Sequence, residues 1–209
     1  MRKLMMLLLA LAPMVLWAQD NTWERPDEEE VEVKEKKGKF IKDQKYLQGA
    51  VPMVNGKVVF SKHINAPGKK AGQLYAIAKE YMEKMQKEKN QISSKFITTD
   101  SVNNQITGVY EEWLVFKKTA IVLDRTRFTY ALEVACQDGG ADIQISHIRY
   151  LYDEERQPQR FTAEEWISDK EAVNKKNTKL LPLSGKFRRK TIDRKDFLFN
   201  KFESLLNEH

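Results

Sequence analysis

Cysteine is nearly absent from this chain of 209 residues, with Cys136 as its single example. One cysteine cannot form an intramolecular disulfide, so the stability of the fold has to come from its core. Cys136 also lies far from the N-terminus, which excludes a lipidated N-terminal cysteine. Because a thiol at a core position behaves as a small apolar group, we interpret Cys136 as a core residue and not as a nucleophile.

Motifs that carry a recognisable chemistry are also lacking. The chain contains no Gly-x-Ser-x-Gly turn for a serine nucleophile and no glycine-rich loop that would cradle a phosphate. His63 and His147 have no Cys, Asp or Glu at metal-ligand spacing, and His209 is the terminal residue. We therefore predict no catalytic residue, no metal site and no cofactor.

Two pairs of adjacent carboxylates, Glu111-Glu112 and Glu164-Glu165, are the features most typical of an enzyme, because an exported glycosidase uses two acidic side chains. Neighbouring side chains on a strand point to opposite faces, and neighbours on a helix diverge. Neither pair therefore presents two carboxylates to one bond. A small exported hydrolase, with a site assembled from separate strands, stays open as the alternative function.

Long apolar runs are confined to residues 4–16, which follow the positive charges of Arg2 and Lys3. This order, with the small residue Ala18 shortly afterwards, is typical of a secretory signal peptide. Residues 4–18 make 15 positions, fewer than the roughly 20 that a membrane-spanning helix needs. We predict a signal peptide over residues 1–18 and a periplasmic or secreted product without a transmembrane span. A retained membrane anchor is the alternative.

Positive charge is concentrated near the C-terminus. Without residues 1–18 the chain keeps 34 Lys and Arg against 30 Asp and Glu. Residues 170–209 hold eleven basic and five acidic side chains, so their local excess is larger than that of the whole mature chain. Such a segment either contacts an anionic partner or is a solvated surface. Export argues against nucleic acid as the partner.

Residues 19–47 are rich in charge and poor in large apolar side chains, and the runs 27–30 and 34–37 consist of charged residues alone. A stretch of this composition cannot bury enough apolar surface to offset its ordering entropy. We predict a flexible charged tether over residues 19–47 and a single domain over residues 48–209.

The spacing of apolar residues predicts a strand and then a helix at the start of the domain. The strand covers residues 57–64 and follows the turn signal Asn55-Gly56. The helix covers residues 71–85 and follows Pro67-Gly68. The apolar positions are Val58, Phe60 and Ile64 in the strand, and Ala71, Leu74, Tyr75, Ala78, Met82 and Met85 in the helix.

From residue 95 to residue 152 the apolar period changes to two, which predicts four strands. Turn signals at residues 103–104, 117–119 and 138–140 separate these strands and suit tight antiparallel connections. In the third of the four runs Val122, Phe128, Tyr130, Leu132, Val134 and Cys136 alternate with polar positions that include Arg125, Arg127 and Glu133. One face of the sheet is therefore expected to meet a core, and the other to meet water.

Two further helices are predicted after the last strand. Thr162 and Glu165 have capping-box spacing, which predicts a short helix pinned by Trp166 and Ile167. Residues 174–190 are interpreted as a long connection.

The final helix is predicted to begin near Asp193. Asp193 and Asp196 fit a cap with a carboxylate at the third helical position, and Ile192 faces Phe197 as a hydrophobic staple. Arg188 and Arg189 would then precede the helix in a polar connection. The apolar residues expected to dock this helix on the sheet are Leu198, Phe202, Leu205 and Leu206.

The predicted order β-α-β-β-β-β-α indicates an α+β fold, in which helices gather on one face of a five-stranded antiparallel sheet. Residues 51–60, Pro67-Gly68 before a helix with Tyr75, and residues 150–153 and 185–193 are similar to an exported Gram-negative bacterial family of unknown function. That family is described as having a TATA-binding-protein-like fold. The resemblance implies a fold and a compartment, but it brings no activity and no DNA-binding role.

Aromatic and arginine side chains supply the candidate binding surface, because these residue types are the usual anchors of interfaces. The candidates are Trp113, Tyr150, Tyr152, Trp166, Arg149, Arg188 and Arg189. We interpret the protein as a non-catalytic binding or interaction module. Its partner would be an envelope protein, an anionic glycan or a lipid head group. The alternative for Trp113 and Trp166 is that they fix helices onto the sheet.

The predicted signal peptide implies where the mature protein begins. Protein recovered from cells should begin near Gln19, because the apolar stretch is too short to stay in the membrane as a span. Mass spectrometry of the intact protein measures this. Recovery of residues 1–18 in a membrane fraction would contradict it.

Overall fold

A computed structural model describes residues 44–208 of the chain. The predicted leader at residues 1–18 and most of the predicted tether lie outside the described residues. The tether's last four residues, 44–47, pack against the domain, with Tyr46 in a short 3-10 helix η1 (Gln44–Tyr46) and only 8% exposed.

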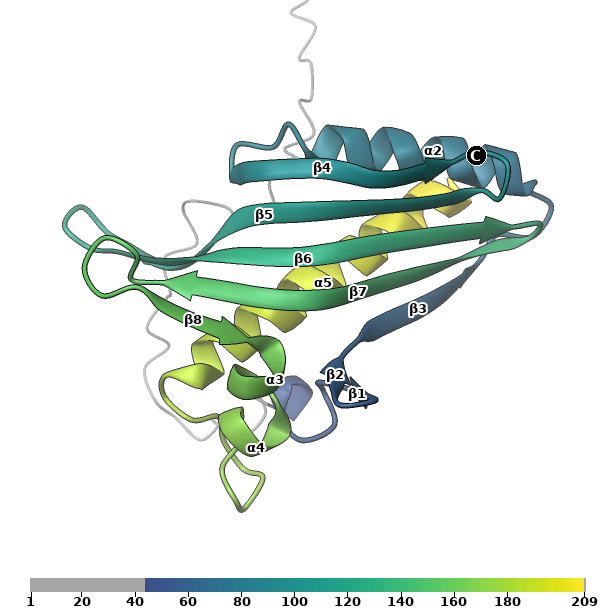
Figure 1. Cartoon of the computed structure of the whole chain (residues 1–209). Coiled ribbons are helices and arrows are strands. Elements are labelled where there is room, and N and C mark those ends of the chain that lie inside the picture. The colour runs from purple at the N-terminus through teal and green to yellow at the C-terminus, as the bar shows by residue number, and fades with distance from the viewer. Residues whose placement is uncertain (1–43, 209) are drawn as a thin grey trace, which may run out of the picture.

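One antiparallel sheet forms the body of the molecule (Figure 1). Its strands are β3 (Phe60–Asn65), β4 (Gln91–Asp100), β5 (Gln105–Lys118), β6 (Leu123–Gln137), β7 (Gly140–Tyr152) and β8 (Gln159–Thr162). The order is β3-β7-β6-β5-β4, and β8 also pairs with β7. The meander β4 to β7 and its three turns are confirmed. The sheet has six strands instead of the predicted five, because the short and polar β8 shares one edge of β7 with β3.

The predicted strand over residues 57–64 is divided in the structure. β2 (Lys57–Val58) forms a small hairpin with β1 (Met53–Val54), and β3 starts again at Phe60. Asn55 and Gly56 link β1 to β2 with φ angles of 50° and 75°. These positive angles are the reason for an Asn-Gly pair at a tight hairpin turn.

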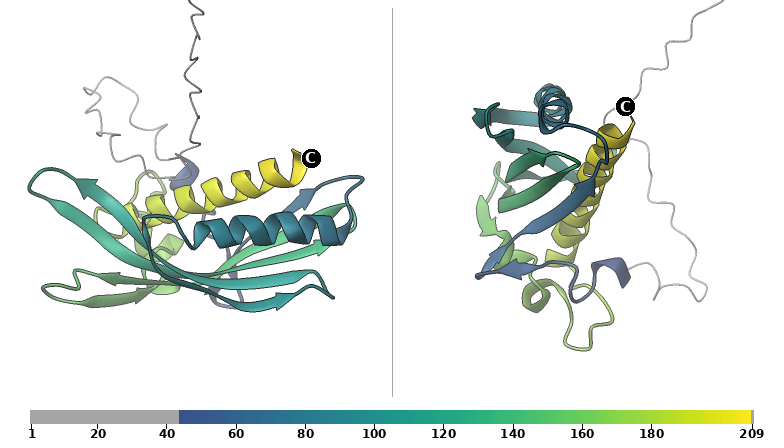
Figure 2. Two further views of the ribbon diagram at one scale, coloured as in Figure 1. Left: turned by 90° about the horizontal axis from the view of Figure 1, so that it is seen from above. Right: turned by 90° about the vertical axis from the view of Figure 1, so that its right-hand side faces the viewer.

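Two long helices, α2 (Ala71–Met85) and α5 (Ser184–Asn207), pack against the same face of the sheet (Figure 2). α2 buries the predicted stripe through Leu74, Ala78, Met82 and Met85, and adds Tyr81. The core around the first turn of α5 is aromatic, and Phe187 of α5 contacts several rings. These rings are Phe116, Tyr150, Tyr152, Phe161 and Trp166.

The predicted start of α5 is wrong, because the helix begins at Ser184 and Asp193 and Asp196 lie inside it. The first turns look polar in the sequence, yet Arg188 is fully buried. Since a buried arginine occupies a position of the apolar stripe, the hydrophobic pattern is broken where the helix begins. Asp193 does not cap the helix. Its Oδ1 accepts a hydrogen bond of 2.8 Å from the Tyr46 hydroxyl.

Two short helices join β8 to α5. α3 (Ala163–Trp166) has the predicted capping box, in which Thr162 and Glu165 each accept a hydrogen bond from the other's backbone N–H. Ile167 is completely buried behind it. α4 (Asp169–Ala172) follows directly. The capping box predicted from the sequence for α3 is therefore confirmed, since both of its partners lie within four residues of each other.

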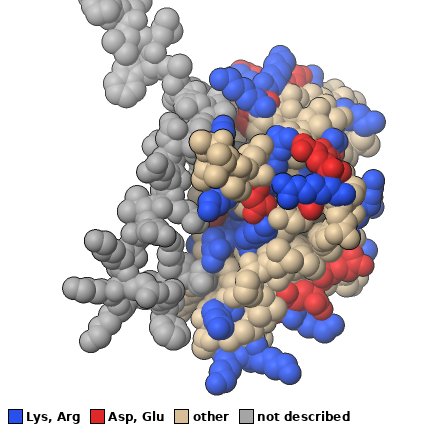
Figure 3. Space-filling model, turned by 90° about the vertical axis from the view of Figure 1, so that its left-hand side faces the viewer, with Lys and Arg blue, Asp and Glu red and all other residues tan. Residues whose placement is uncertain are grey.

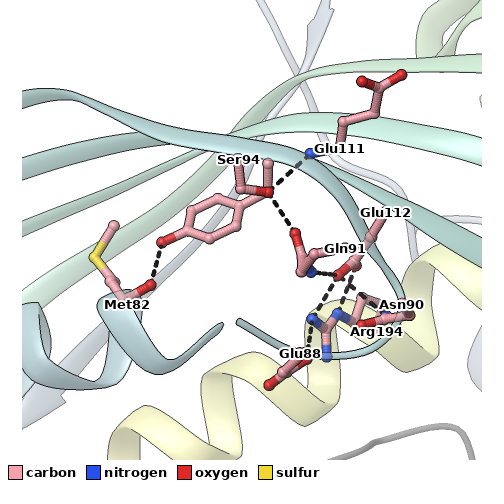
Figure 4. Close-up of polar contacts among 9 residues, drawn as sticks. Met82, Glu88, Asn90, Gln91, Ser94, Glu111, Glu112 and Arg194 are labelled. Atoms are coloured by element: carbon pink, nitrogen blue, oxygen red, sulfur yellow. Dashed lines mark hydrogen bonds and ion pairs between the residues drawn. The ribbon is translucent and has the colours of Figure 1, made fainter. Parts of the chain in front are cut away.

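A buried cluster of charged groups lies where α2, α5 and β5 meet (Figure 4). Arg194 of α5 donates two hydrogen bonds of 2.7 Å to the two carboxylate oxygens of Glu112 on β5. Gln91 donates a further one of 2.6 Å to Glu112. Glu88, in the turn after α2, lies 3.5 Å from the same guanidinium. Both Arg194 and Glu112 are almost inaccessible to solvent, so this pairing compensates for their loss of hydration.

The Glu88 carboxyl in this cluster has a raised pKa. Burial raises the pKa of its carboxyl to about 7, the Arg194 charge opposes that rise, and the Glu112 charge adds to it. Both carboxylate oxygens of Glu112 accept hydrogen bonds of 2.7 Å from Arg194, whereas Glu88 lies 3.5 Å from the guanidinium and interacts with it more weakly. Folding therefore favours the protonated form of Glu88.

Phe202 tests whether α5 is an integral part of the fold. Its side chain is fully buried, and its ring meets Tyr81 of α2 edge-on with centroids 4.9 Å apart. Phe202→Ala should lower the free energy of unfolding by about 3–5 kcal/mol, because it leaves a cavity between the two helices. Denaturant melts measure the change. The exposed Asn200→Ala on the same helix should stay within about 0.5 kcal/mol of wild type. An unchanged melt for Phe202→Ala would mean that α5 is not docked.

Glu88 gives a prediction about pH. Between about pH 4.5 and 7 the unfolded chain has lost the Glu88 proton while the folded chain keeps it. The free energy of unfolding should therefore fall as pH rises, by up to about 1.4 kcal/mol per pH unit, and level off above pH 7. Glu88→Gln should flatten this slope in denaturant melts across the window. Glu83→Gln, on the exposed face of α2, serves as control, and an equal slope in all three proteins would refute the assignment.

Candidate functional site

The second face of the sheet carries no helix in residues 44–208, and it faces the viewer in Figure 1. Residues on β5 and β6 alternate between fully buried side chains beneath the sheet and half-exposed side chains on this open face. The predicted separation of a core face from a solvent face is confirmed by this alternation. What the open face offers to a partner is decided by its half-exposed residues.

Arginines gather on the open face around one tryptophan. Trp113 on β5 stands directly opposite Arg127 on β6, which in turn stands opposite Leu151 on β7. Directly opposed residues share a face, and Leu151 is itself opposite Arg160 on β8. The same argument places Arg125 and Arg149 on this face, through Val115 and Thr129. We name Trp113, Arg125, Arg127, Arg149 and Arg160 the arginine face.

The arginine face is held in place by stacking and by ion pairs. The Arg125 guanidinium carbon lies 3.6 Å from the centre of the Trp113 ring, and that of Arg127 lies 5.6 Å away. Arg127 also contacts Glu111 at 3.4 Å and donates to Glu154 at 3.2 Å. Its hydrogen bond to Glu154, with smaller contributions from the Glu154 and Glu111 charges, raises the pKa of the Arg127 guanidinium. These contacts fix the two central arginines before any partner arrives.

Arg149 and Arg160 differ from the two central arginines. Both are exposed, and neither forms an ion pair within residues 44–208. Their donors therefore point into solvent at the edge of the same surface. A planar guanidinium with free donors recognises carboxylate, sulfate or phosphate through paired hydrogen bonds.

Only two of the seven predicted binding residues, Trp113 and Arg149, lie on this face. Tyr150 is 2% exposed, and its hydroxyl shares a hydrogen bond of 2.6 Å with Thr191 of α5. Tyr152 packs half-buried against Phe187. Trp166 of α3 stacks on Phe161 of β8 with ring centroids 3.9 Å apart. Its position therefore agrees with the alternative, in which Trp166 fixes a helix onto the sheet.

Arg188 and Arg189 lie on α5, on the other side of the sheet. Arg188 is buried and donates to the carbonyl oxygens of Tyr46, Leu47 and Ile167 at 2.6, 2.6 and 2.7 Å. It also donates to Asp169 at 2.6 Å. Arg189 is half-buried beside the Tyr46 ring, 5.6 Å from its centre. The Arg188 side chain is thus inaccessible to a partner, and the expectation that it belongs to a polar connection is wrong.

Arg125, Arg127 and Arg160 were not among the binding residues expected from the sequence. The apolar alternation put Arg125 and Arg127 on the solvent face of their strand, but no sequence pattern connected them with Trp113. The missing information was the β5–β6 register, which pairs Trp113 with Arg127. Arg160 was hidden because β8 itself was not predicted.

The paired carboxylates have structural roles. Glu111 and Glu112 point to opposite faces of β5, toward Arg127 and Arg194. Glu164 accepts a hydrogen bond of 2.8 Å from the Val58 N–H, and Glu165 caps α3. Each of these four side chains therefore has a partner within the fold.

Cys136 is buried, and burial raises the pKa of its thiol to about 11, away from the range of a nucleophile. His147 lies on an exposed bulge of β7 with a φ of 54°. His63 is on β3, where its Nδ1 lies 2.8 Å from Asp142. Neither the thiol nor the two imidazoles belong to the arginine face.

A shallow hollow of about 340 Å³ lies on the open face at the opposite end from Trp113. It is lined by Ser61, Lys62, His63, Glu133, Ala135, Asp142, Ile143 and Gln144. Although a serine, a histidine and an aspartate meet here, the His63 Nε2 is directed toward Gly140, and no hydrogen bond joins it to Ser61. The hollow therefore lacks the serine–histidine contact that nucleophilic catalysis requires.

Comparison with known proteins places the fold. Among helices of the described residues, none has the length and apolar character needed to cross a membrane. Residues 60–151 match the family described as "Domain of unknown function (DUF4468) with TBP-like fold". No curated protein gives a significant match.

Two crystal structures are similar to this chain. A DUF4468 family protein from Bacteroides ovatus is 40% identical, with a TM-score of 0.74 over 82% of this chain and 96% of that one. A TBP-like protein from Parabacteroides distasonis is 20% identical, with a TM-score of 0.61 over 75% of this chain and 96% of that one. The second likeness concerns the fold alone. The resemblance drawn from the sequence is confirmed: this chain belongs to the DUF4468 family, a domain family of unknown function with a TBP-like fold.

Proposed function

We propose that the protein is an exported, non-catalytic binding module, and that the arginine face is its contact surface for an anionic partner. The observation that carries the proposal is the position of Arg149 and Arg160, exposed and without ion pairs in residues 44–208, beside the Trp113 stack. Tryptophan and arginine are the residue types enriched where binding energy concentrates.

The rigidity of the surface supports this function. The arginine face is built on β5, β6, β7 and β8, so its side chains start from hydrogen-bonded strands and not from loops. Stacking on Trp113 holds Arg125 in one orientation. Binding would therefore cost little conformational entropy at Trp113, Arg125 and Arg127.

The chemistry of the partner follows from the donors. Guanidinium groups spaced across several strands fit an extended partner with repeated carboxylate, sulfate or phosphate groups, as on an anionic glycan. An envelope protein with an acidic surface or a lipid head group offers the same groups. A sulfated polysaccharide presents such repeated anionic groups and is therefore a suitable probe.

The alternative of a small exported hydrolase finds less support in the geometry. Its carboxylate candidates, Glu112, Glu164 and Glu165, are engaged by Arg194, the Val58 N–H and the α3 cap. A catalytic carboxylate needs to be free to act on a substrate, whereas Glu112 is buried against Arg194, and Glu164 and Glu165 accept hydrogen bonds from backbone N–H groups. The binding module is therefore the function that the site supports best.

The arginine face is tested by removing its two exposed charges. Arg149→Gln with Arg160→Gln should elute from dextran-sulfate resin at clearly lower salt than wild type, because two phosphate-like contacts are lost. Lys175→Gln with Lys176→Gln removes the same charge from the exposed loop between α4 and α5 and should elute like wild type. Equal shifts in both variants would show that net charge alone drives retention and would overturn the proposal.

A further inference from the structure

The hairpin between β5 and β6 carries an apolar tip at the end of the molecule opposite the β4–β5 turn (Figure 1). Ile121 is 92% exposed, Leu123 52% and Val122 42%. With Ala120, these are four consecutive apolar residues, which we name the apolar tip. A cluster of exposed apolar side chains on a soluble domain marks a contact with another apolar phase or surface.

The backbone of the apolar tip is largely satisfied within the hairpin. Lys118 pairs with Leu123 at its base, and the Thr119 N–H donates to the Val122 carbonyl at 2.8 Å. The Val122 N–H donates in turn to the Thr119 hydroxyl at 3.0 Å. Unpaired backbone groups are the main obstacle to placing a loop in an apolar medium. This turn has already removed part of that obstacle.

Charge around the apolar tip is positive where it is unpaired. Lys117 and Lys118 are exposed and form no ion pair within residues 44–208. The carboxylate nearest to the tip in sequence, Asp124, pairs with Lys186 at 2.7 Å and receives a hydrogen bond of 3.0 Å from Tyr152. Figure 3 views this end of the molecule, where Lys and Arg side chains lie beside uncharged surface.

Two of the three acidic residues of the neighbouring β7–β8 loop are also paired, and Asp153 forms no ion pair within residues 44–208. Glu154 contacts Arg127, and Glu155 lies 3.9 Å from Arg125. The free charges closest to Ile121 in sequence are therefore the two ammonium groups. Ammonium groups beside a convex apolar tip match the phosphate and acyl layers of a bilayer.

We propose that the apolar tip, with Lys117 and Lys118, inserts into the surface of a bilayer that contains anionic phospholipid. A convex tip that presents single side chains fits a lipid surface better than a protein partner, which would need a matching pocket. This inference does not depend on the arginine face.

The hairpin at the other end of the sheet supplies an internal control. Val102, in the β4–β5 turn, is 86% exposed, so it resembles Ile121 in exposure and in apolar character. Asp100, and not a lysine, stands beside it and accepts a hydrogen bond from the Val102 N–H. If exposure alone caused insertion, both tips would enter the bilayer.

The experiment places a nitrobenzoxadiazole fluorophore on the full chain at Ile121→Cys or at Val102→Cys. Cys136 is buried with a raised pKa, so the introduced exposed cysteine reacts first. Vesicles contain equal parts of phosphatidylglycerol and phosphatidylcholine, or phosphatidylcholine alone. We expect blue-shifted, brighter emission from position 121 with the anionic vesicles only, and no change from position 102. The leader is common to both proteins and cannot produce this difference.

The affinity for anionic vesicles is then measured by sedimentation. Ile121→Asp should weaken it by at least about tenfold, and so should Lys117→Gln with Lys118→Gln. Lys175→Gln with Lys176→Gln should leave it unchanged.

Three results obtained with vesicles would overturn the proposal. They are an unchanged signal at position 121 while the protein sediments with vesicles, an equal response at position 102, and an equal response to neutral vesicles. A blue shift that appears without vesicles and grows with protein concentration would overturn it too, because a second copy of the chain would then cover the tip.

Discussion

The bidentate ion pair between Arg194 and Glu112 is the interaction on which the arrangement of helices and sheet depends. It joins the middle of α5 to the centre of β5 at two distances of 2.7 Å, and Glu88 brings the end of α2 to the same guanidinium. Breaking such a pair by removing one partner costs about 3–5 kcal/mol, since an uncompensated charge stays buried. A hydrophobic stripe allows a helix to rotate or slide, whereas this pair permits one register.

The two faces of β5 show how one strand serves two purposes. Glu112 and Tyr110 point toward the helices, and the tyrosine hydroxyl donates to the Met82 carbonyl of α2 at 3.0 Å. Glu111 and Trp113 point the other way and support Arg127 and Arg125. The buried network therefore fixes the strand whose outer side carries the arginine face. The order of the arginine face therefore depends on the buried contacts on the other side of β5.

Local signals predicted most of the fold, and the failures share a physical cause. The strand alternation in β6 and the Thr162 capping box depend on neighbours in the sequence, and both are confirmed. The start of α5 was missed because Arg188 is buried by carbonyl oxygens from residues 46, 47 and 167, which no local pattern reveals. The arginine face was missed for the same reason: strand register across β5 to β8 brings its residues together, and register is a long-range property.

Arg188 also determines how the domain would respond to mechanical force. Its guanidinium holds the carbonyl oxygens of Tyr46 and Leu47, close to the start of the described residues, against α5 and Ile167. Tension applied at the N-terminal end of the described residues would reach the Lys45–Asp193 ion pair and this cluster of short hydrogen bonds before it reached the strands. It would be resisted there in parallel by several bonds, and the strands beyond Val51 would be shielded from being peeled off one at a time.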